Sequence, residues 1–134
     1  MHVKVSTKKY VYEFDLERRV TVIRGDSGTG KTLLAHLLVA EPETGVTVEC
    51  ERNFVLMNNN IRINYSTWFK DYDNVVFILD EDSRWLRDRR FYDAALDSGA
   101  WLLIMDRSTQ LTTVESVMRL RVSGKYRTLE KLVC

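Results

Sequence analysis

The sequence predicts an α/β fold, a three-layer αβα sandwich whose sheet is mostly parallel and begins with an antiparallel N-terminal meander. Two apolar runs, Val75–Leu79 and residues 101–105, are continuous, which is typical of strands buried on both faces of a parallel sheet. Segments with helical spacing alternate with strand-like segments along the chain. Because such alternation joins parallel strands through right-handed crossovers, these observations together predict the α/β class.

The N-terminal part is predicted to form the meander. Residues 3–5 and 10–15 alternate apolar and polar side chains around a polar turn, as half-buried strands do. A second turn, at residues 17–19, leads to a third strand at Val20–Arg24. We therefore expect three antiparallel strands that end in the strand at Val20–Arg24.

A helix is predicted to follow at residues 31–40, ended by Pro42. Residues 45–49 have the pattern of a short strand, whereas residues 54–57 fit either a strand or a buried turn. Four aromatic residues further on recur at helical spacing, which favours a helix with a buried face over an aromatic platform for nucleic acid. They are Tyr65, Trp68, Phe69 and Tyr72.

The C-terminal half continues the alternation of helices and strands. Residues 91–98 are predicted to form a helix that Gly99 closes. The strand at residues 101–105 follows, and residues 117–122 are predicted to form the last strand, ended by Gly124.

The length and composition fit a single domain over residues 1–134, with 45% hydrophobic and 29% charged residues. A net charge of +1 produces no global field that would indicate a nucleic acid or a membrane as partner. No apolar stretch approaches the ~20 residues that span a bilayer, and the N-terminus lacks the apolar region of a signal peptide. These features predict a cytoplasmic protein in which Cys50 and Cys134 stay reduced.

Residues 25–32 match the phosphate-binding pattern G-x-x-x-x-G-K-[ST] at every fixed position. The glycines allow the backbone to wrap a polyphosphate, while successive N–H groups and the following helix N-terminus offer positive charge. We expect Lys31 to contact the β- and γ-phosphates and the Thr32 hydroxyl to bind Mg²⁺. The residues predicted to hold the nucleotide are Gly25, Asp26, Ser27, Gly28, Thr29, Gly30, Lys31 and Thr32.

Two acidic residues, Asp80 and Glu81, directly follow the apolar run Val75–Leu79. Ligand sites in open α/β sheets lie at the carboxyl ends of the strands, so both carboxylates are expected near the phosphate loop. Asp80 is predicted to hold Mg²⁺ opposite Thr32, and Glu81 to accept a hydrogen bond from the attacking water. The predicted catalytic residues are therefore Glu81 and Lys31, and the predicted metal ligands are Thr32 and Asp80.

With these motifs, at residues 25–32 and 75–81, the chain resembles P-loop NTPases of the additional-strand, catalytic-glutamate division, which includes ABC-type and AAA-type ATPase cores. The resemblance implies P-loop NTPase topology, with strand 101–105 between strands 20–24 and 75–79. It also implies that strand 117–122 lies on the other side of strand 20–24. More narrowly, residues 19–27 resemble small bacterial ATP-binding proteins of unassigned role.

Several features that the larger members of this division carry are absent from the sequence. No stretch resembles L-S-G-G-Q, which disfavours an ABC transporter motor, and the chain is too short for the helical lid of a full AAA module. The guanine-reading pattern N-K-x-D is also absent, so ATP is favoured over GTP. The resemblance thus implies ATP and Mg²⁺ as ligands of a minimal core.

The predicted function is Mg²⁺-dependent ATP binding and hydrolysis by a minimal P-loop ATPase. One alternative is a switch with little turnover, whose nucleotide state changes its affinity for a protein partner or for a second copy of itself. Another is a small-molecule or nucleotide kinase that uses a group of arginines, which also fit a solvated helix face or a contact with a partner or a nucleic acid. These arginines are Arg84, Arg87, Arg89 and Arg90.

Two other positions each keep two interpretations. Asp106 or Arg107, after the strand at 101–105, fits a sensor of the γ-phosphate or an ordinary residue at the end of a strand. Tyr10 and Tyr12 fit either stacking on adenine or packing across neighbouring strands.

Overall fold

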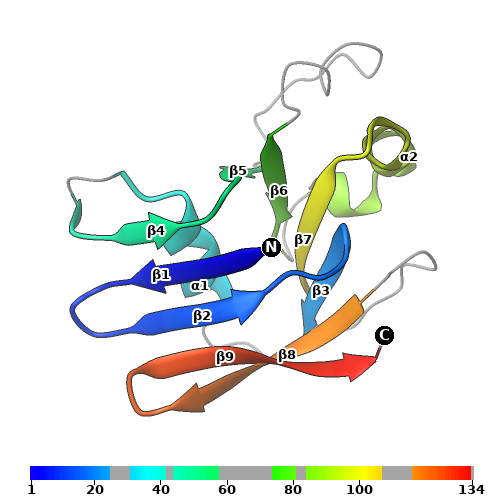
Figure 1. The fold of residues 1–134 in the computed structure, drawn as a ribbon. Helices are drawn as coiled ribbons and strands as arrows, with labels where there is room; N and C mark the ends of the chain where they lie inside the picture. The colour runs from blue at the N-terminus through cyan, green and yellow to red at the C-terminus, as the bar shows by residue number, and fades with distance from the viewer. Residues whose placement is uncertain (25–30, 42–43, 58–73, 81–83, 107–115, 134) are drawn as a thin grey trace.

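The computed structural model describes residues 1–24, 31–41, 44–57, 74–80, 84–106 and 116–133 (Figure 1). These residues form nine strands, two α-helices and one 3-10 turn. The strands are β1 (His2–Ser6), β2 (Val11–Asp15), β3 (Val20–Arg24), β4 (Thr47–Glu49), β5 (Asn53–Leu56), β6 (Val75–Leu79), β7 (Trp101–Asp106), β8 (Ser116–Ser123) and β9 (Tyr126–Val133). The helices are α1 (Lys31–Leu38) and α2 (Arg89–Ser98), and the 3-10 turn η3 (Arg84–Arg87) precedes α2.

All nine strands belong to one mixed sheet, in the order β4-β1-β2-β9-β8-β3-β7-β6-β5. Strands β8, β3, β7, β6 and β5 run parallel to one another. The expected order of the middle strands is confirmed, since β7 lies between β3 and β6 and β8 pairs with the other side of β3. Every residue of β6 is buried, as the continuous apolar run predicts for a strand covered on both faces.

The other half of the sheet is built from hairpins. β1 pairs antiparallel with β2 and with β4, and β8 pairs antiparallel with β9. The two halves join where β2 runs parallel to β9, through the pairs Val11–Tyr126 and Tyr12–Arg127. Figure 1 shows β1, β2 and β9 running nearly across the direction of β3, β7 and β6, so the sheet is curled into a half-barrel.

The predicted three-layer αβα sandwich is wrong, because a curled sheet takes the place of one helical layer. Val3 and Val5 of β1 pack in the same buried cluster as Leu34 of α1 and Leu103 of β7. The sheet therefore folds over the face that a flat sheet would leave to several helices. With two short α-helices in the described residues, the chain is mostly β.

The predicted meander is also wrong in its last step. The β1–β2 hairpin forms as expected, but β2 does not continue into an antiparallel pair with β3. Strands β9 and β8 stand between them. The sequence analysis missed β9 because Tyr126–Val133 follows a glycine turn and mixes charged with apolar residues, so it carries no continuous apolar run.

These findings overturn the family assignment. A P-loop NTPase of the additional-strand, catalytic-glutamate division is an αβα sandwich, whereas this protein has a nine-stranded half-barrel sheet and two short helices in its described parts. The implied P-loop NTPase topology agrees with the structure only in the order of the middle strands. We therefore do not retain the assignment, including the narrower likeness to small bacterial ATP-binding proteins.

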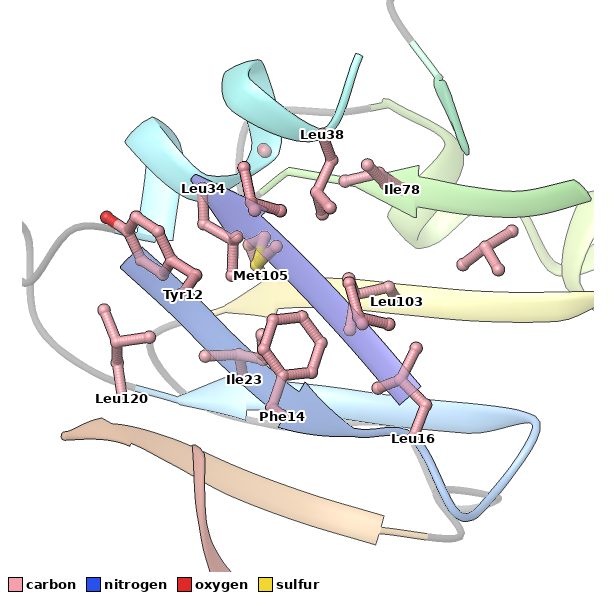
Figure 2. Close-up of a cluster of buried hydrophobic side chains, with 14 residues drawn as sticks. Tyr12, Phe14, Leu16, Ile23, Leu34, Leu38, Ile78, Leu103, Met105 and Leu120 are labelled. Atoms are coloured by element: carbon pink, nitrogen blue, oxygen red, sulfur yellow. The ribbon is translucent and has the colours of Figure 1, made fainter. Parts of the chain in front are cut away.

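Each face of the parallel strands has its own core. On one face, α1 packs with side chains of β1, β2, β3, β6 and β7, and Figure 2 shows this cluster. On the other face, Phe91 and Ala95 of α2 pack with Trp85 of η3 and with the alternate residues of β3, β6 and β7. The labelled members of the first cluster are Tyr12, Phe14, Leu16, Ile23, Leu34, Leu38, Ile78, Leu103, Met105 and Leu120.

Helix α2 carries capping residues at both ends. The Asp88 carboxylate accepts a hydrogen bond of 3.1 Å from the Phe91 N–H, which satisfies one free donor of the first turn. Gly99 ends the helix at φ +77°, a left-handed conformation that glycine adopts without the penalty a Cβ would add. The predicted end of this helix is therefore confirmed, and its start lies two residues before residue 91.

The remaining elements differ from the predictions mainly at their ends. α1 stops at Leu38, before residue 40, and β4 is shorter than the strand predicted at 45–49. Of the two interpretations of residues 54–57, the strand is confirmed as β5. The helix predicted around Tyr65 lies outside the described residues.

No helix in the described ranges has the length and apolar character that crossing a membrane requires.

Leu103→Ala is expected to destabilise the protein by about 2–5 kcal/mol, because Leu103 is fully buried on β7 and its removal leaves a cavity in the first cluster. Urea unfolding followed by circular dichroism measures this change. Leu33→Ala on α1 is the control: Leu33 is 38% exposed, and its loss should cost less than about 1 kcal/mol. Equal losses in the two variants would contradict the described core.

The pKa of His2 is expected to lie above 6.5, because its imidazolium is held by Asp15 and Glu13 across the β1–β2 pair. Nδ1 lies 2.8 Å from an Asp15 carboxylate oxygen, and Nε2 lies 2.7 Å from one of Glu13. This stabilisation is complete below about pH 6.5, the unfolded value, and is lost as the pH rises through the folded pKa.

NMR titration of the His2 ring measures this pKa. Asp15→Asn removes the larger cause and should lower the His2 pKa, whereas Asp97→Asn on α2 should leave it unchanged. A His2 pKa that is the same in the native protein and in Asp15→Asn would show that the hydrogen bond does not form in solution.

Candidate functional site

The candidate site lies at the edge of the sheet where β3, β7 and β6 end. These strands are parallel and in register, with Ile23 opposite Met105 and Leu79 opposite Ile104. Their carboxyl ends therefore meet at one edge, as ligand sites of parallel sheets require. β3 ends at Arg24, and the candidate phosphate loop begins at the next residue.

Lys31 is the first residue of α1, and its side chain is only 4% exposed. The helix packs through Leu34, Ala35 and Leu38, and residue 31 falls on the same face by helical spacing. Lysine is almost never buried to this degree unless its ammonium has a compensating group. Of the described residues, Thr21 is the other buried polar side chain.

Thr32 follows Lys31, about 100° further around the axis of α1, and lies on an exposed face of the helix. His36 is one turn further along this face and is also exposed, so it is an ordinary helix-surface residue. The Thr32 hydroxyl is therefore open to solvent at the first turn of the helix. An oxygen in this position is a suitable ligand for a hard divalent cation.

Asp80 directly follows β6 and is partly buried. β6 is the second strand from β3, with β7 between them. Since neighbouring strands lie about 4.8 Å apart, the ends of β3 and β6 are about 10 Å apart. This separation lets a carboxylate after β6 and a ligand held after β3 share one ion or one phosphate group.

The rest of the predicted site lies outside the described residues. The structure places Lys31, Thr32 and Asp80 at one sheet edge, and the roles assigned to all of these residues stay predictions. Within the described ranges, no three His, Cys, Asp or Glu side chains come together as a metal site. The predicted residues outside those ranges are Gly25, Asp26, Ser27, Gly28, Thr29, Gly30 and Glu81.

The arginines after β6 are spread over η3 and α2. The Arg84 guanidinium lies 4.5 Å from the centroid of the Trp85 ring, a cation–π contact. The side chain of Arg89 is 91% exposed and lies 3.9 Å from the Asp93 carboxylate, one helical turn away. Arg89 thus has the surroundings of a solvated helix face, the simplest of its three interpretations.

Tyr12 is completely buried in the first cluster, which supports strand packing over adenine stacking for this residue. Burial raises the pKa of its phenol. The Arg127 guanidinium of β9 lies 4.0 Å from the ring centroid of Tyr10 and 5.6 Å from that of Tyr12. Sequence reasoning missed this contact because it depends on β9 pairing with β2, which no local pattern signals.

Two other predicted positions are only partly described. Asp106 ends β7 beside Arg24, while Arg107 lies outside the described residues, so the sensor role of either residue stays a prediction. Cys50 is a free, half-buried thiol, and Cys134 lies outside the described residues.

No protein-family model matches this chain, and no curated protein matches its sequence.

Lys31 is expected to react with an amine-acylating reagent more slowly than Lys8, Lys9 and Lys125, because those three side chains are exposed and Lys31 is buried. Mass spectrometry of digested protein measures the rate at each lysine. In urea the four rates should converge, which provides the control. If Lys31 reacts as fast as Lys8 in the folded protein, the described start of α1 is incorrect.

Proposed function

We propose that the protein binds ATP with Mg²⁺ at the sheet edge formed by β3, β7 and β6, and hydrolyses it there. The observation that carries the proposal is the position of the motif. Residues 25–30 span the gap between the end of β3 and the start of α1, and Lys31 follows on the buried face of the helix. The complete pattern G-x-x-x-x-G-K-[ST] in this strand–helix context supports a polyphosphate ligand.

The electrostatics of the edge also support an anionic ligand. The N-terminus of α1 directly follows the motif and offers the positive end of the helix dipole. The Lys31 ammonium at the same point adds a full positive charge, and its burial strengthens its attraction for a phosphate. Together they favour a ligand with several negative oxygens.

The oxygen atoms of Thr32 and Asp80 fit Mg²⁺, which takes hard oxygen ligands and needs only one or two protein groups beside the phosphates. Bound Mg²⁺ would neutralise charge on the phosphate oxygens. Lys31 would bind and orient the terminal phosphates. Glu81, the residue after Asp80, would accept a hydrogen bond from a water molecule and so direct its oxygen at the γ-phosphate.

ATP is proposed over GTP because the sequence lacks the N-K-x-D pattern that reads guanine. The cytoplasm is the proposed location, since it supplies Mg²⁺ and ATP and keeps a thiol such as Cys50 reduced.

Phosphate release from Mg-ATP tests the proposal, with ATP binding measured in parallel. Lys31→Ala should lose both binding and turnover, because it removes the charge that contacts the phosphates. Glu81→Gln should keep binding and lose turnover by about 100-fold or more, since it removes only the group that orients water. The two variants together separate the binding role from the catalytic role.

Two control variants remove a charge elsewhere. Arg18→Ala removes an exposed cation that precedes β3, at the opposite end of that strand, and Asp97→Asn removes an exposed carboxylate from α2. Both should bind and hydrolyse ATP as the native protein does. ATP binding without phosphate release in the native protein would contradict hydrolysis and favour the nucleotide-dependent switch, and phosphate transfer only to an added acceptor would favour a kinase.

A further inference from the structure

The positive charge of the protein is unevenly distributed, although the net charge is only +1. Residues 3–12 contain three lysines and no acidic residue. Residues 116–129 contain three arginines and one lysine, again without an acidic residue. All 19 acidic residues lie elsewhere in the chain, so these two segments are locally cationic.

The fold brings the turns of these two segments together. The β1–β2 turn comes just before Val11, and the β8–β9 turn comes just before Tyr126. Val11 and Tyr126 are opposite each other where β2 runs parallel to β9, and the Val11 N–H donates a hydrogen bond of 2.8 Å to the Lys125 carbonyl. Figure 1 shows both turns at the same end of the sheet.

Some of the cations in these segments already face carboxylates on neighbouring strands. Arg119 lies 2.9 Å and Arg121 lies 3.9 Å from Glu130 of β9. Lys4 has Glu13 opposite it on β2 and Glu49 opposite it on β4. Within the described ranges, the lysines and the arginine at the two turns form no ion pair with a carboxylate.

We call the remaining group the two-turn surface. Its members are Lys8, Lys9 and Tyr10 of the first turn and Lys125, Tyr126 and Arg127 of the second. Lys8, Lys9 and Lys125 are exposed, so their charges point into solvent rather than into the core.

Aromatic rings accompany these cations. Tyr126 is 55% exposed, and the Lys125 ammonium lies 5.4 Å from its ring centroid. The Arg127 guanidinium lies over the ring of Tyr10. The described residues include three large hydrophobic side chains that are exposed, and two of them, Val122 and Tyr126, belong to the β8–β9 hairpin.

We propose that the two-turn surface binds single-stranded nucleic acid. Cations that face solvent attract the phosphate backbone, and binding releases its counterions. An exposed ring beside an ammonium offers a stacking surface for a base, and single strands expose their base faces whereas duplexes do not. A surface that combines four cations with two tyrosines thus suits a single strand better than a surface that carries charges alone.

This site is separate from the proposed ATP site, and the proposal does not depend on ATP hydrolysis. None of the six residues belongs to the phosphate loop or to the acidic pair directly after β6. β8 runs parallel to β3 with Arg119 opposite Arg24, and it continues four residues further to Ser123. The two-turn surface therefore lies beyond the carboxyl end of β3. It is at the same end of the parallel strands as the proposed ATP site, but different residues form it.

Fluorescence anisotropy of a labelled single-stranded DNA of about 12 nucleotides tests the proposal, a length within the site sizes of small single-strand-binding domains. The native protein should bind it, with affinity that falls as salt rises. Lys8→Glu/Lys9→Glu should weaken binding at least about tenfold, because it reverses two of the four charges. Lys8→Gln/Lys9→Gln should weaken it less.

Two matched controls test where the loss of affinity comes from. One distinguishes the two-turn surface from a general effect of net charge, and the other distinguishes the Tyr126 ring from its hydroxyl. Arg89→Glu/Arg90→Glu makes the same change in net charge on α2 and should alter the affinity less than about twofold. Tyr126→Ala should weaken binding several-fold, and Tyr126→Phe, which keeps the ring, should not. Circular dichroism of each variant establishes that its fold is retained.

Several outcomes would overturn the proposal. They are the absence of salt-dependent binding by the native protein, equal weakening by the α2 control, and no loss of affinity in Tyr126→Ala. Tighter binding to duplex DNA of the same length, or to vesicles containing phosphatidylserine, would likewise assign the surface to another partner. Because no ATP is present in the assay, failure here leaves the proposed hydrolysis standing, and the reverse also holds.

Discussion

The pairing of β3 with β7 on one side and β8 on the other is the constraint on which the structure depends. β3 is buried on both faces except at Arg24, and it separates the two hydrophobic clusters. It also ends at the edge where the candidate phosphate loop begins, so its register with β7 decides how far Arg24 lies from Asp80. A shift of one residue would exchange the two faces of β3 and move the start of α1 away from its core.

The sequence predicts the buried strands and the caps well, because their signals are local. The apolar run of β6 and the glycine that ends α2 each determine an element through its own residues. The curl of the sheet has no such local signal. It depends on β9, whose mixed sequence is compatible with a loop, and on the two-residue contact of β9 with β2, which joins distant parts of the chain. A flat sandwich was therefore the wrong expectation.

The candidate site, like the fold, can be predicted from the sequence only in part. The motif at residues 25–32 and the acidic pair after β6 can be recognised from residue types and spacing, and the strand order brings their flanking elements to one edge. The burial of Lys31 could also be foreseen from its helical spacing to Leu34 and Leu38. The two-turn surface could not, since a net charge summed over the chain conceals cations that only the β2–β9 pairing gathers.

The position of β8 and β9 between β2 and β3 also affects how the chain reaches this fold. β2 and β3 are consecutive in the sequence, yet one edge of β2 pairs with β9 and one edge of β3 pairs with β8. Both partners come from the far end of the described chain, so neither strand is hydrogen bonded on both edges until that end has folded. Closing such long loops costs entropy before any contact offsets it, so refolding should be slow for a domain of this size. Until β8 arrives, β3 presents an open edge rich in β-branched residues, which is where intermolecular association of partly folded chains would begin.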